Sequence, residues 1–185
     1  MFTMNIYDKS YYERYVKQAK SELGKKIYKA RWELIKKYVD EGKLLDYGCG
    51  PGAFNAACPG GFELHGFDIN PSCGFSKIDH WERWNIVTFW DSLEHIPDFY
   101  RELKRLSPKW LFITCPNLEA VKGDIKDWRH YRPGEHLFYF DKYSLEVILE
   151  SLRYKIIDHN FDEGKLRNPN NPDWIMTVVA KRDWE

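Results

Sequence analysis

The sequence predicts an α/β fold in which a mostly parallel sheet is covered by helices on both faces. Two observations predict this class. Short apolar runs alternate with helical patterns along most of the chain, and the last two β-rich runs have no helical pattern between them. The second feature indicates an antiparallel hairpin at one edge of the sheet. The 185 residues contain no repeat and no internal linker, so we expect one domain over residues 1–185.

The elements are predicted from apolar spacing. Between Ser10 and Val39, apolar residues recur every three or four positions, which predicts one helix. We therefore expect residues 1–40 to form a helical cap and residues 41–185 to form the core. Helical patterns also cover Pro97–Leu106 and Lys142–Leu152. The expected strands are Lys43–Tyr47, Glu63–Asp68, Asn85–Phe89, Trp110–Cys115, Tyr154–His159 and Ile175–Lys181.

The composition excludes several classes of protein. Aromatic residues make up 17% of the chain and apolar residues 43%, which excludes intrinsic disorder. A net charge of zero removes the basic field that most nucleic-acid binders need. No apolar run is long enough to span a membrane, and Met1–Ser10 lacks the apolar centre of a secretory signal. The four scattered cysteines have no C-x-x-C spacing, so we expect free thiols, a cytoplasmic location and no membrane partner.

A glycine-rich turn is the sharpest motif. The apolar strand that ends at Tyr47 runs into Gly48, Gly50 and Gly52, which alternate with other residues. Glycines in such a turn let the backbone approach a ligand closely. The turn belongs to the carboxyl edge of the sheet, where open α/β sheets bind ligands. Asp68 ends the next expected strand, 20 residues after Gly48, and an acid there can accept hydrogen bonds from ribose hydroxyls.

Two cofactors fit this turn. Gly48, Gly50 and Ala53 satisfy the G-x-G-x-x-[G/A] pattern of dinucleotide binders, which leaves NAD open. Asp46, however, lies two residues before the first glycine, and its carboxylate would repel a pyrophosphate and attract an ammonium or sulfonium group. This favours S-adenosylmethionine (SAM), which carries an amino-acid end and no phosphate.

Three further stretches complete a resemblance to a known family. Trp90–His95 reads W-D-S-L-E-H, Thr114–Asn117 ends in P-N, and Glu135–Phe140 reads E-H-L-F-Y-F. With Leu44–Gly52 and Asp68, they resemble class I SAM-dependent methyltransferases over roughly residues 40–181. The last stretch is similar to the ubiquinone-biosynthesis-like branch (methyltransferase type 11/23).

The resemblance implies a Rossmann-like fold, a seven-stranded sheet with a C-terminal antiparallel hairpin, and SAM as the cofactor. Only about 15 residues separate Asn70 from Asn85, so the region of the third strand is expected to be shortened. The acid that contacts the adenine in the family has no clear equivalent there, and Asp79 is no more than a candidate. In the family the methionine part of SAM lies at the glycine turn, the ribose at the acid, and the methyl group near the W-D pair. The implied cofactor-binding residues are Asp46, Gly48, Cys49, Gly50, Gly52, Asp68, Ile69, Trp90 and Asp91.

Two histidines are candidates for a general base. Histidine is the usual base near neutral pH, and His95 and His136 both lie in the family-like stretches at the expected carboxyl edge. The alternative is that each histidine only packs and holds its loop.

The same stretches leave a metal site open, although we do not favour one. Asp91, Glu94 and His95 share one helical face, and His136 would add a fourth ligand for Mg²⁺, Mn²⁺ or Zn²⁺. This set resembles the E-x-x-E-H…H arrangement of small-RNA 2′-O-methyltransferases, with Asp91 in place of the first Glu.

The sequence therefore predicts a methyltransferase that acts on an oxygen or nitrogen of a small-molecule or sugar-like acceptor. We expect Lys126–Gly134, with two arginines beside aromatic rings, to form the acceptor pocket or its lid. The alternatives are a metal-assisted RNA-end 2′-O-methyltransferase, a SAM-binding module without catalysis, and an NAD-dependent oxidoreductase. The oligomeric state is left open.

Overall fold

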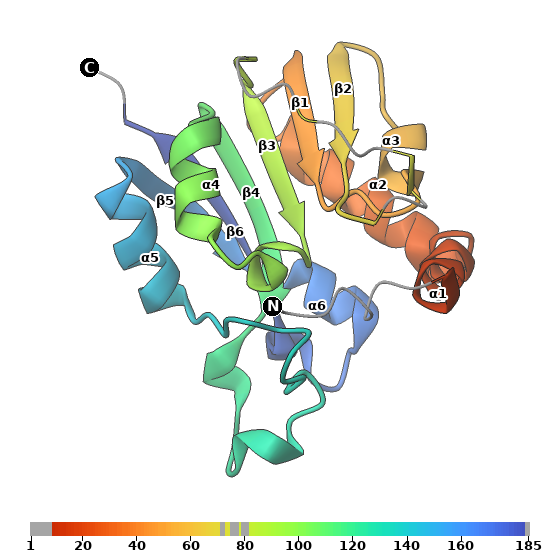
Figure 1. The fold of residues 1–185 in the computed structure, drawn as a ribbon, viewed down its shortest axis with the longest axis vertical. Helices are drawn as coiled ribbons and strands as arrows, with labels where there is room; N and C mark the ends of the chain where they lie inside the picture. Colours follow the sequence, from red (N-terminus) through yellow and green to blue (C-terminus); the bar gives the residue numbers. More distant parts are fainter. Residues whose placement is uncertain (1–8, 71–72, 75–77, 79–81, 184–185) are drawn as a thin grey trace.

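A computed structural model describes residues 9–70, 73–74, 78 and 82–183 of the chain. Its strands form one sheet in the order β2-β1-β3-β4-β6-β5. The first four strands in this order run parallel to one another, and β6 pairs antiparallel with both β4 and β5 (Figure 1). The strands are β1 (Gly42–Tyr47), β2 (Phe62–Phe67), β3 (Ile86–Trp90), β4 (Trp110–Pro116), β5 (Tyr154–Asn160) and β6 (Ile175–Arg182).

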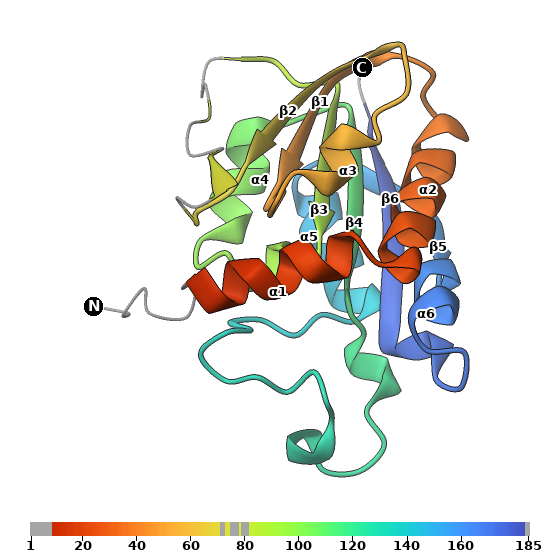
Figure 2. The ribbon, with the colours of Figure 1, turned by 90° about the vertical axis from the view of Figure 1, so that its right-hand side faces the viewer.

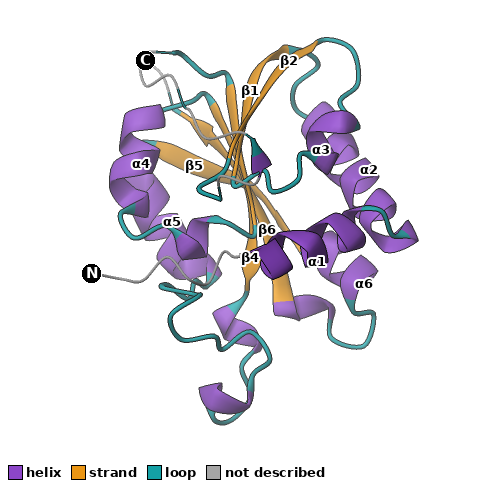
Figure 3. Ribbon diagram, turned by 45° about the vertical axis from the view of Figure 1, so that its right-hand side comes forward, coloured by secondary structure: helices purple, strands orange, loops and turns teal. Residues whose placement is uncertain are grey.

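Helices cover both faces of the sheet (Figure 3). Helices α4 and α5 pack on one face, while α2, α3 and α6 lie on the other. Neighbouring strand residues alternate between the two faces, so Leu44 belongs to the core beneath α2 and Leu45 to the core beneath α4 and α5. The helices are α1 (Lys9–Ala19), α2 (Glu22–Lys36), α3 (Ala53–Ala56), α4 (Phe99–Leu106), α5 (Lys142–Ser151) and α6 (Asp162–Arg167). This arrangement confirms the predicted α/β class, its largely parallel sheet and its C-terminal antiparallel hairpin.

The predicted strand count of seven was wrong. Six strands are present in the described part of the chain, and none of the described residues between β2 and β3 belongs to a strand. The short spacing between Asn70 and Asn85 leaves too little chain for a full strand, helix and connections. Asp79, the candidate adenine contact, lies outside the described residues.

The prediction of one helix over Ser10–Val39 was also wrong, because two helices meet at a break. The Ser21 hydroxyl accepts a hydrogen bond from the Gly24 amide at 3.0 Å and donates one to the Gln18 carbonyl at 2.6 Å, which caps α2 and ends the first helix. A Cβ atom at Gly24 would lie 2.4 Å from that carbonyl oxygen. Serine and glycine therefore act together to turn the chain here, and apolar spacing alone does not reveal the break.

A short helix interrupts the C-terminal hairpin, where the sequence predicted only a loop. Helix α6 follows β5 directly, and the Asn160 side chain accepts a hydrogen bond from the Asp162 amide at 3.1 Å. A one-turn helix at Pro172–Trp174 then leads into β6. A helix of six residues is too short to give an apolar period, which explains why the pattern did not predict it.

The carboxyl ends of the parallel strands face three other segments. Helix α1 runs across this edge (Figure 2). The long segment between β4 and α5 projects beyond it and contains only two single-turn helices, Leu118–Ala120 and Ile125–Asp127. Helix α6 closes the third side, against α2. Among the described residues, no helix combines the length and the hydropathy needed to cross a bilayer.

Gly164 provides a test of how tightly α6 is packed. A Cβ atom at this position would lie 1.8 Å from the Pro172 carbonyl oxygen and 2.9 Å from that of Ile175. We expect Gly164→Ala to lower the free energy of unfolding by about 2 kcal/mol or more, because the backbone has to move to admit the methyl group. Urea unfolding measures the change.

Gly60→Ala is the matched control for this substitution. A Cβ atom at Gly60 would meet no described atom within 4 Å, so the change in stability should stay within about 0.5 kcal/mol. Equal stabilities for the two variants would contradict the packing of α6.

Candidate active site

The glycine turn after β1 is fixed by contacts with its neighbours. Gly48 has a φ of +84°, and its amide donates to the Phe67 carbonyl at 2.7 Å. A Cβ atom at Gly48 would lie 2.4 Å from the Cβ atom of Ser92, so only glycine fits against the turn that follows β3. Gly50, with a φ of +52°, has no described atom within 4 Å of the corresponding position. The turn is therefore closed on the side of Ser92 and open beside Gly50.

Asp68 lies directly after β2 and faces this turn. Its Oδ2 atom accepts a hydrogen bond from the Gly50 amide at 2.8 Å, and Oδ1 accepts one from the Asn70 amide at 2.8 Å. The sequence predicted that Asp68 and the glycine turn lie side by side, and the structure brings them together. Each carboxylate oxygen can accept a further bond, so the group is both anchored and available to a ligand.

Asp46 is buried within the sheet. The Thr88 hydroxyl on the neighbouring strand donates to its Oδ1 atom at 2.8 Å. Burial raises the pKa of Asp46 to about 7, although the Thr88 hydrogen bond and the charge of Arg31 oppose the shift. A carboxyl group with this pKa gains its charge readily when a cation approaches.

The remaining residues of the predicted cofactor set differ in exposure. Cys49 is buried, its amide donates to the Phe67 carbonyl at 3.0 Å, and burial raises the pKa of its thiol. Gly52, with a φ of +70°, precedes α3. Ile69 is 58% exposed, so its side chain is free to cover a ligand beside Asp68. Trp90 is buried at the end of β3 against Phe54, with ring centroids 5.7 Å apart.

Asp91 belongs to a cluster of four charged side chains that the sequence did not predict. We call Arg31, Asp91, Glu163 and Arg167 the charge cluster. Arg167 bonds both carboxylate oxygens of Asp91, with Nη1 3.2 Å from Oδ1, and also bonds Glu163. Arg31 donates to the two oxygens of Glu163 at 2.9 and 2.7 Å and lies 3.4 Å from Asp91. The cluster thus joins α2, the turn after β3 and α6.

Opposite charges favour the ionised forms of Asp91 and Arg167 despite burial. Burial acts to raise the pKa of Asp91, but the guanidinium groups of Arg167 and Arg31 outweigh it and lower the pKa. Burial likewise opposes ionisation of Arg167, and the charges of Asp91 and Glu163 raise its pKa overall. Two positive and two negative groups balance, which is the condition under which buried charges are tolerated.

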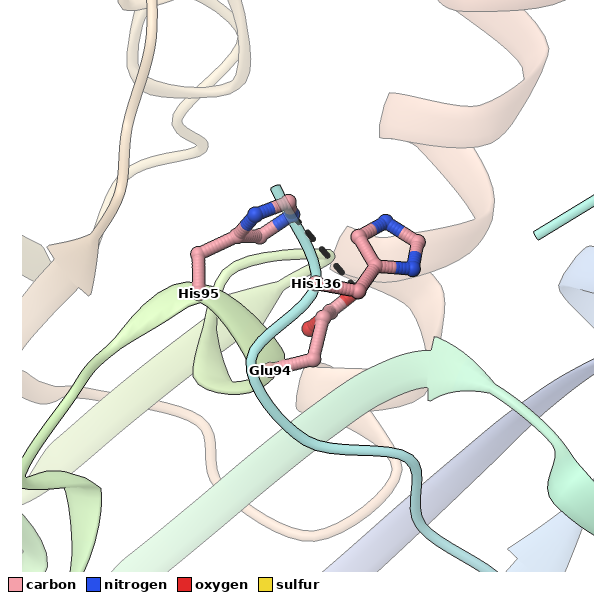
Figure 4. Close-up of side chains that lie close together, drawn as sticks. All are labelled: Glu94, His95 and His136. Carbon is pink, nitrogen blue, oxygen red and sulfur yellow. Dashed lines mark ion pairs between the residues drawn. The ribbon is translucent and has the colours of Figure 1, made fainter. Parts of the chain in front are cut away.

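Glu94, His95 and His136 form a second group beside the charge cluster (Figure 4). Each offers one ligand atom, and these atoms lie within 4.8 Å of one another. The amides of Leu137 and Phe138 both donate to the Glu94 carbonyl, at 2.9 and 3.2 Å, and this fixes the segment of His136 against the turn after β3. The metal-site alternative left open by the sequence grouped Asp91 with these three residues. Asp91 is bound by the arginines instead.

The Glu94 carboxyl group is buried beneath the carboxyl edge of the sheet and lacks a hydrogen-bond partner among the described residues. Neither oxygen accepts a hydrogen bond within the described part of the chain, and His95 Nε2 lies 3.9 Å from Oε1. Burial, with the nearby charge of Asp91, raises the pKa of Glu94 well above its ordinary value. A buried acid without a partner in the described chain is able to bind a cation or to accept from a hydrogen-bond donor.

Burial disfavours the charged form of both histidines of the group. His95 Nδ1 lies 2.8 Å from the Glu135 carbonyl, which can only accept, so Nδ1 carries the hydrogen and Nε2 keeps its lone pair. Burial lowers the pKa of His95, and it lowers that of His136 to about 4 with a further contribution from His95. The ring centroids are 4.8 Å apart. Neutral imidazoles at this position can accept a proton or bind a metal.

The segment predicted to form the acceptor pocket contributes rings to the same edge. Trp128 is buried, and its ring centroid lies 5.3 Å from that of His130. His130 also contacts Trp174, at 6.2 Å, so a residue just before β6 completes the ring set. Arg132 is paired with Glu135 at 3.2 Å, which leaves it less free to bind an anionic acceptor than the sequence indicated.

Four residues of the candidate site were not predicted from the sequence. Arg31 sits in a helical pattern that reads as solvated, Glu163 and Arg167 lie on the unpredicted helix α6, and Trp174 precedes the last strand. The even charge of the chain gives no signal for pairs that are 60 to 132 residues apart in sequence. Their contacts arise only when α2 and the segment between β5 and β6 pack together in the fold.

Comparisons with known proteins show the family and the fold of the chain. A methyltransferase domain family matches residues 11–159. A search of curated proteins gave no match.

The fold is similar to several solved structures. A SAM-dependent methyltransferase from Archaeoglobus fulgidus is 18% identical, with 91% of this chain and 99% of that one covered and a TM-score of 0.65. The 1,6-didemethyltoxoflavin-N1-methyltransferase of Burkholderia thailandensis is 16% identical over 99% and 92%, with a TM-score of 0.63.

The small RNA methyltransferase HEN1 is 15% identical, with a TM-score of 0.62 over 90% of this chain. The chain spans about a quarter of the length of that structure, 26%. None of these comparisons singles out the ubiquinone-biosynthesis-like branch. The family match covers most of the sequence, and the chain therefore belongs to the methyltransferase domain family, with the Rossmann-like fold of class I SAM-dependent methyltransferases.

Proposed function

We propose that this chain transfers the methyl group of SAM to an oxygen or nitrogen of a small-molecule or sugar-like acceptor. The observation that carries the proposal is the glycine turn, which is open beside Gly50 and anchored to the Asp68 carboxylate at 2.8 Å. Backbone amides and one acid at the carboxyl edge of a parallel sheet suit an adenosyl ligand with a free ribose. The Glu94–His95–His136 group lies at the same edge, in the turn after β3 and in the segment docked on that turn.

Asp46 supports SAM over NAD. Its buried carboxyl group, with a pKa of about 7, lies at the end of β1 immediately before the glycine turn. A pyrophosphate would face a developing negative charge there, whereas the ammonium group of a methionine end would stabilise the ionised form. We expect Asp46, Gly48, Cys49, Gly50 and Gly52 to surround that end.

The reaction that we propose depends mainly on the correct placement of the acceptor beside the methyl group. SAM, when bound, would supply a methyl group on a sulfonium, and the neutral thioether is a good leaving group. Correct placement of the acceptor therefore accounts for most of the catalysis. A base is needed when the acceptor is a hydroxyl or a protonated amine. His95 Nε2 has a free lone pair because Nδ1 donates to the Glu135 carbonyl at 2.8 Å. We propose His95 as this base, with His136 as the alternative.

A metal-assisted RNA-end 2′-O-methyltransferase is the second candidate. Glu94, His95 and His136 fit a divalent cation, since both oxygens of Glu94 are buried without hydrogen-bond partners in the described chain. The fixed Nδ1 hydrogen of His95 orients Nε2 as metal-binding imidazoles are usually oriented. Such an ion would supply positive charge that favours deprotonation of a hydroxyl acceptor. The fold likeness to HEN1, a small RNA methyltransferase, adds support for this candidate.

Cofactor binding is the direct test of the first proposal. We expect calorimetry to detect binding of SAM and S-adenosylhomocysteine (SAH) but not of NAD. Asp68→Ala should weaken SAH at least tenfold, because it removes the ribose acceptor and the anchor of Gly50. Asp98→Ala, which changes an exposed acid before α4, is the control and should bind normally. Absence of heat with either adenosyl ligand would refute the proposal.

The base assignment is tested by methyl transfer. With tritiated SAM and a panel of hydroxyl and amine acceptors, we expect His95→Ala or His136→Ala to reduce the rate by about 10²- to 10⁴-fold. His65→Ala should keep the wild-type rate, because His65 pairs with Glu63 on the edge strand β2. Near-normal rates in both of the first two variants would rule out a histidine base.

Stability with and without metal tests the second candidate. In a chelator, Glu94→Met should raise the free energy of unfolding by about 1 kcal/mol or more, because an unpartnered buried polar group costs about that much. Saturating Mn²⁺, Mg²⁺ or Zn²⁺ should then stabilise the wild type by about 2–3 kcal/mol at a hundredfold excess over the Kd, but not the variant.

Glu150→Met, at an exposed position on α5, is the matched control. It should change neither the free energy of unfolding in the chelator nor the stabilisation by the added ion by more than about 0.5 kcal/mol. A wild-type protein that none of the three ions stabilises would eliminate the metal site, while the methyltransferase proposal would stand.

A further inference from the structure

We infer that Arg167, on the C-terminal helix α6, is a positioning residue for the glycine turn at residues 48–52. Its guanidinium group holds Asp91, and Asp91 fixes the position of the glycine turn through the turn after β3. The inference rests on the proposed function for its ligand. Arg167 bonds both oxygens of Asp91 and reaches Glu163 with the same guanidinium group. No cofactor-binding role is assigned to Arg167 itself.

Asp91 is held in a conformation that needs support. Its φ is +54°, which non-glycine residues rarely adopt, and its amide donates to the Thr114 carbonyl at 2.8 Å. Backbone strain of this kind persists only where the surroundings fix it, and it concentrates at functional sites. The side chain is 30% exposed at the carboxyl edge, so its partners are not explained by core packing alone.

The strained residue is connected directly to the cofactor turn. The hydroxyl of the next residue, Ser92, donates to the Tyr47 carbonyl at 2.5 Å. Its Cβ atom occupies the space where a side chain at Gly48 would lie. Gly50 then bonds Asp68. A displacement of Asp91 would therefore move Ser92 against the turn that meets the ligand.

Helix α6 is a firm base for this connection. Gly164 packs against the Pro172 carbonyl with no room for a methyl group. Glu163 is buried and binds the Arg31 guanidinium through both oxygens. Arg167 thus projects from an element that is fixed to β6 on one side and to α2 on the other.

The experiment compares Arg167→Met, Asp91→Asn and the double variant by SAH calorimetry. We expect each single variant to bind SAH roughly tenfold more weakly, and the double variant to bind no more weakly than the weaker single one. That non-additivity separates action through Asp91 from a general loss of stability. If the losses multiply, or if folded Arg167→Met binds like the wild type, the inference is wrong.

Two further variants keep the test decisive. Lys165→Met, on the exposed side of the same helix where Lys165 pairs with Asp162, should bind SAH normally. Arg167→Lys keeps the charge but not the two-pronged contact, so it should bind with intermediate affinity and serves if Arg167→Met does not fold.

Hydrogen exchange gives a readout without any cofactor. The amides of Gly48, Gly50 and Asp91 are hydrogen-bonded, and they should exchange faster in Arg167→Met or Arg167→Lys while the amides of β4 do not change. If the wild type binds no SAH, the proposed function fails and exchange alone decides the inference. Unchanged exchange at the three amides would overturn it.

Discussion

The charge cluster is the interaction on which the carboxyl edge of the sheet depends. Two guanidinium groups and two carboxylates, largely withdrawn from water, join a helix near the start of the chain, the turn after β3 and a helix near its end. Removal of any one member would leave an unbalanced buried charge, which is far more costly than the loss of a surface pair. The cluster therefore fixes relative positions that the apolar core of the sheet does not determine.

The charge cluster and the Glu94–His95–His136 group lie beside each other at this edge but differ in their electrostatics. In the charge cluster, opposite charges favour the ionised forms of Asp91 and Arg167 although burial opposes them. In the Glu94–His95–His136 group, burial outweighs the nearby opposite charges and favours the neutral acid and the neutral imidazoles. The first arrangement gives rigidity and the second gives groups able to accept a proton or a cation. The rigid charge cluster thus lies beside a site whose buried polar atoms lack partners among the described residues. Such unsatisfied groups lower stability, as is usual for binding sites.

Local patterns predicted much of the fold because they reflect local physics. Alternating apolar runs place Leu44 and Leu45 on opposite faces of a covered strand, and Gly48, the first glycine after Tyr47, meets the steric limit set by Ser92. The helix break at Ser21 and the short helix α6 were missed, since a cap or a single turn carries too few residues to show a period. The shortened stretch after Asn70 signalled a lost strand, yet the expected total of seven followed the family and not the spacing.

The sequence by itself determined the chemistry at the carboxyl edge: a glycine turn, an acid after the next strand, and a histidine in each of two family-like stretches. The glycine turn, Asp68 and His95 follow the ends of parallel strands, which meet at one edge of the sheet, whereas His136 reaches this edge from the long segment after β4. Only the tertiary structure decided which acid is paired with arginines and which is left without a partner. Asp91 pairs with Arg31 and Arg167 while Glu94 remains unpartnered among the described residues, because the arginines arrive from segments 60 and 76 residues away. Contacts between such distant segments depend on how helices pack across the sheet, and no local pattern encodes that packing.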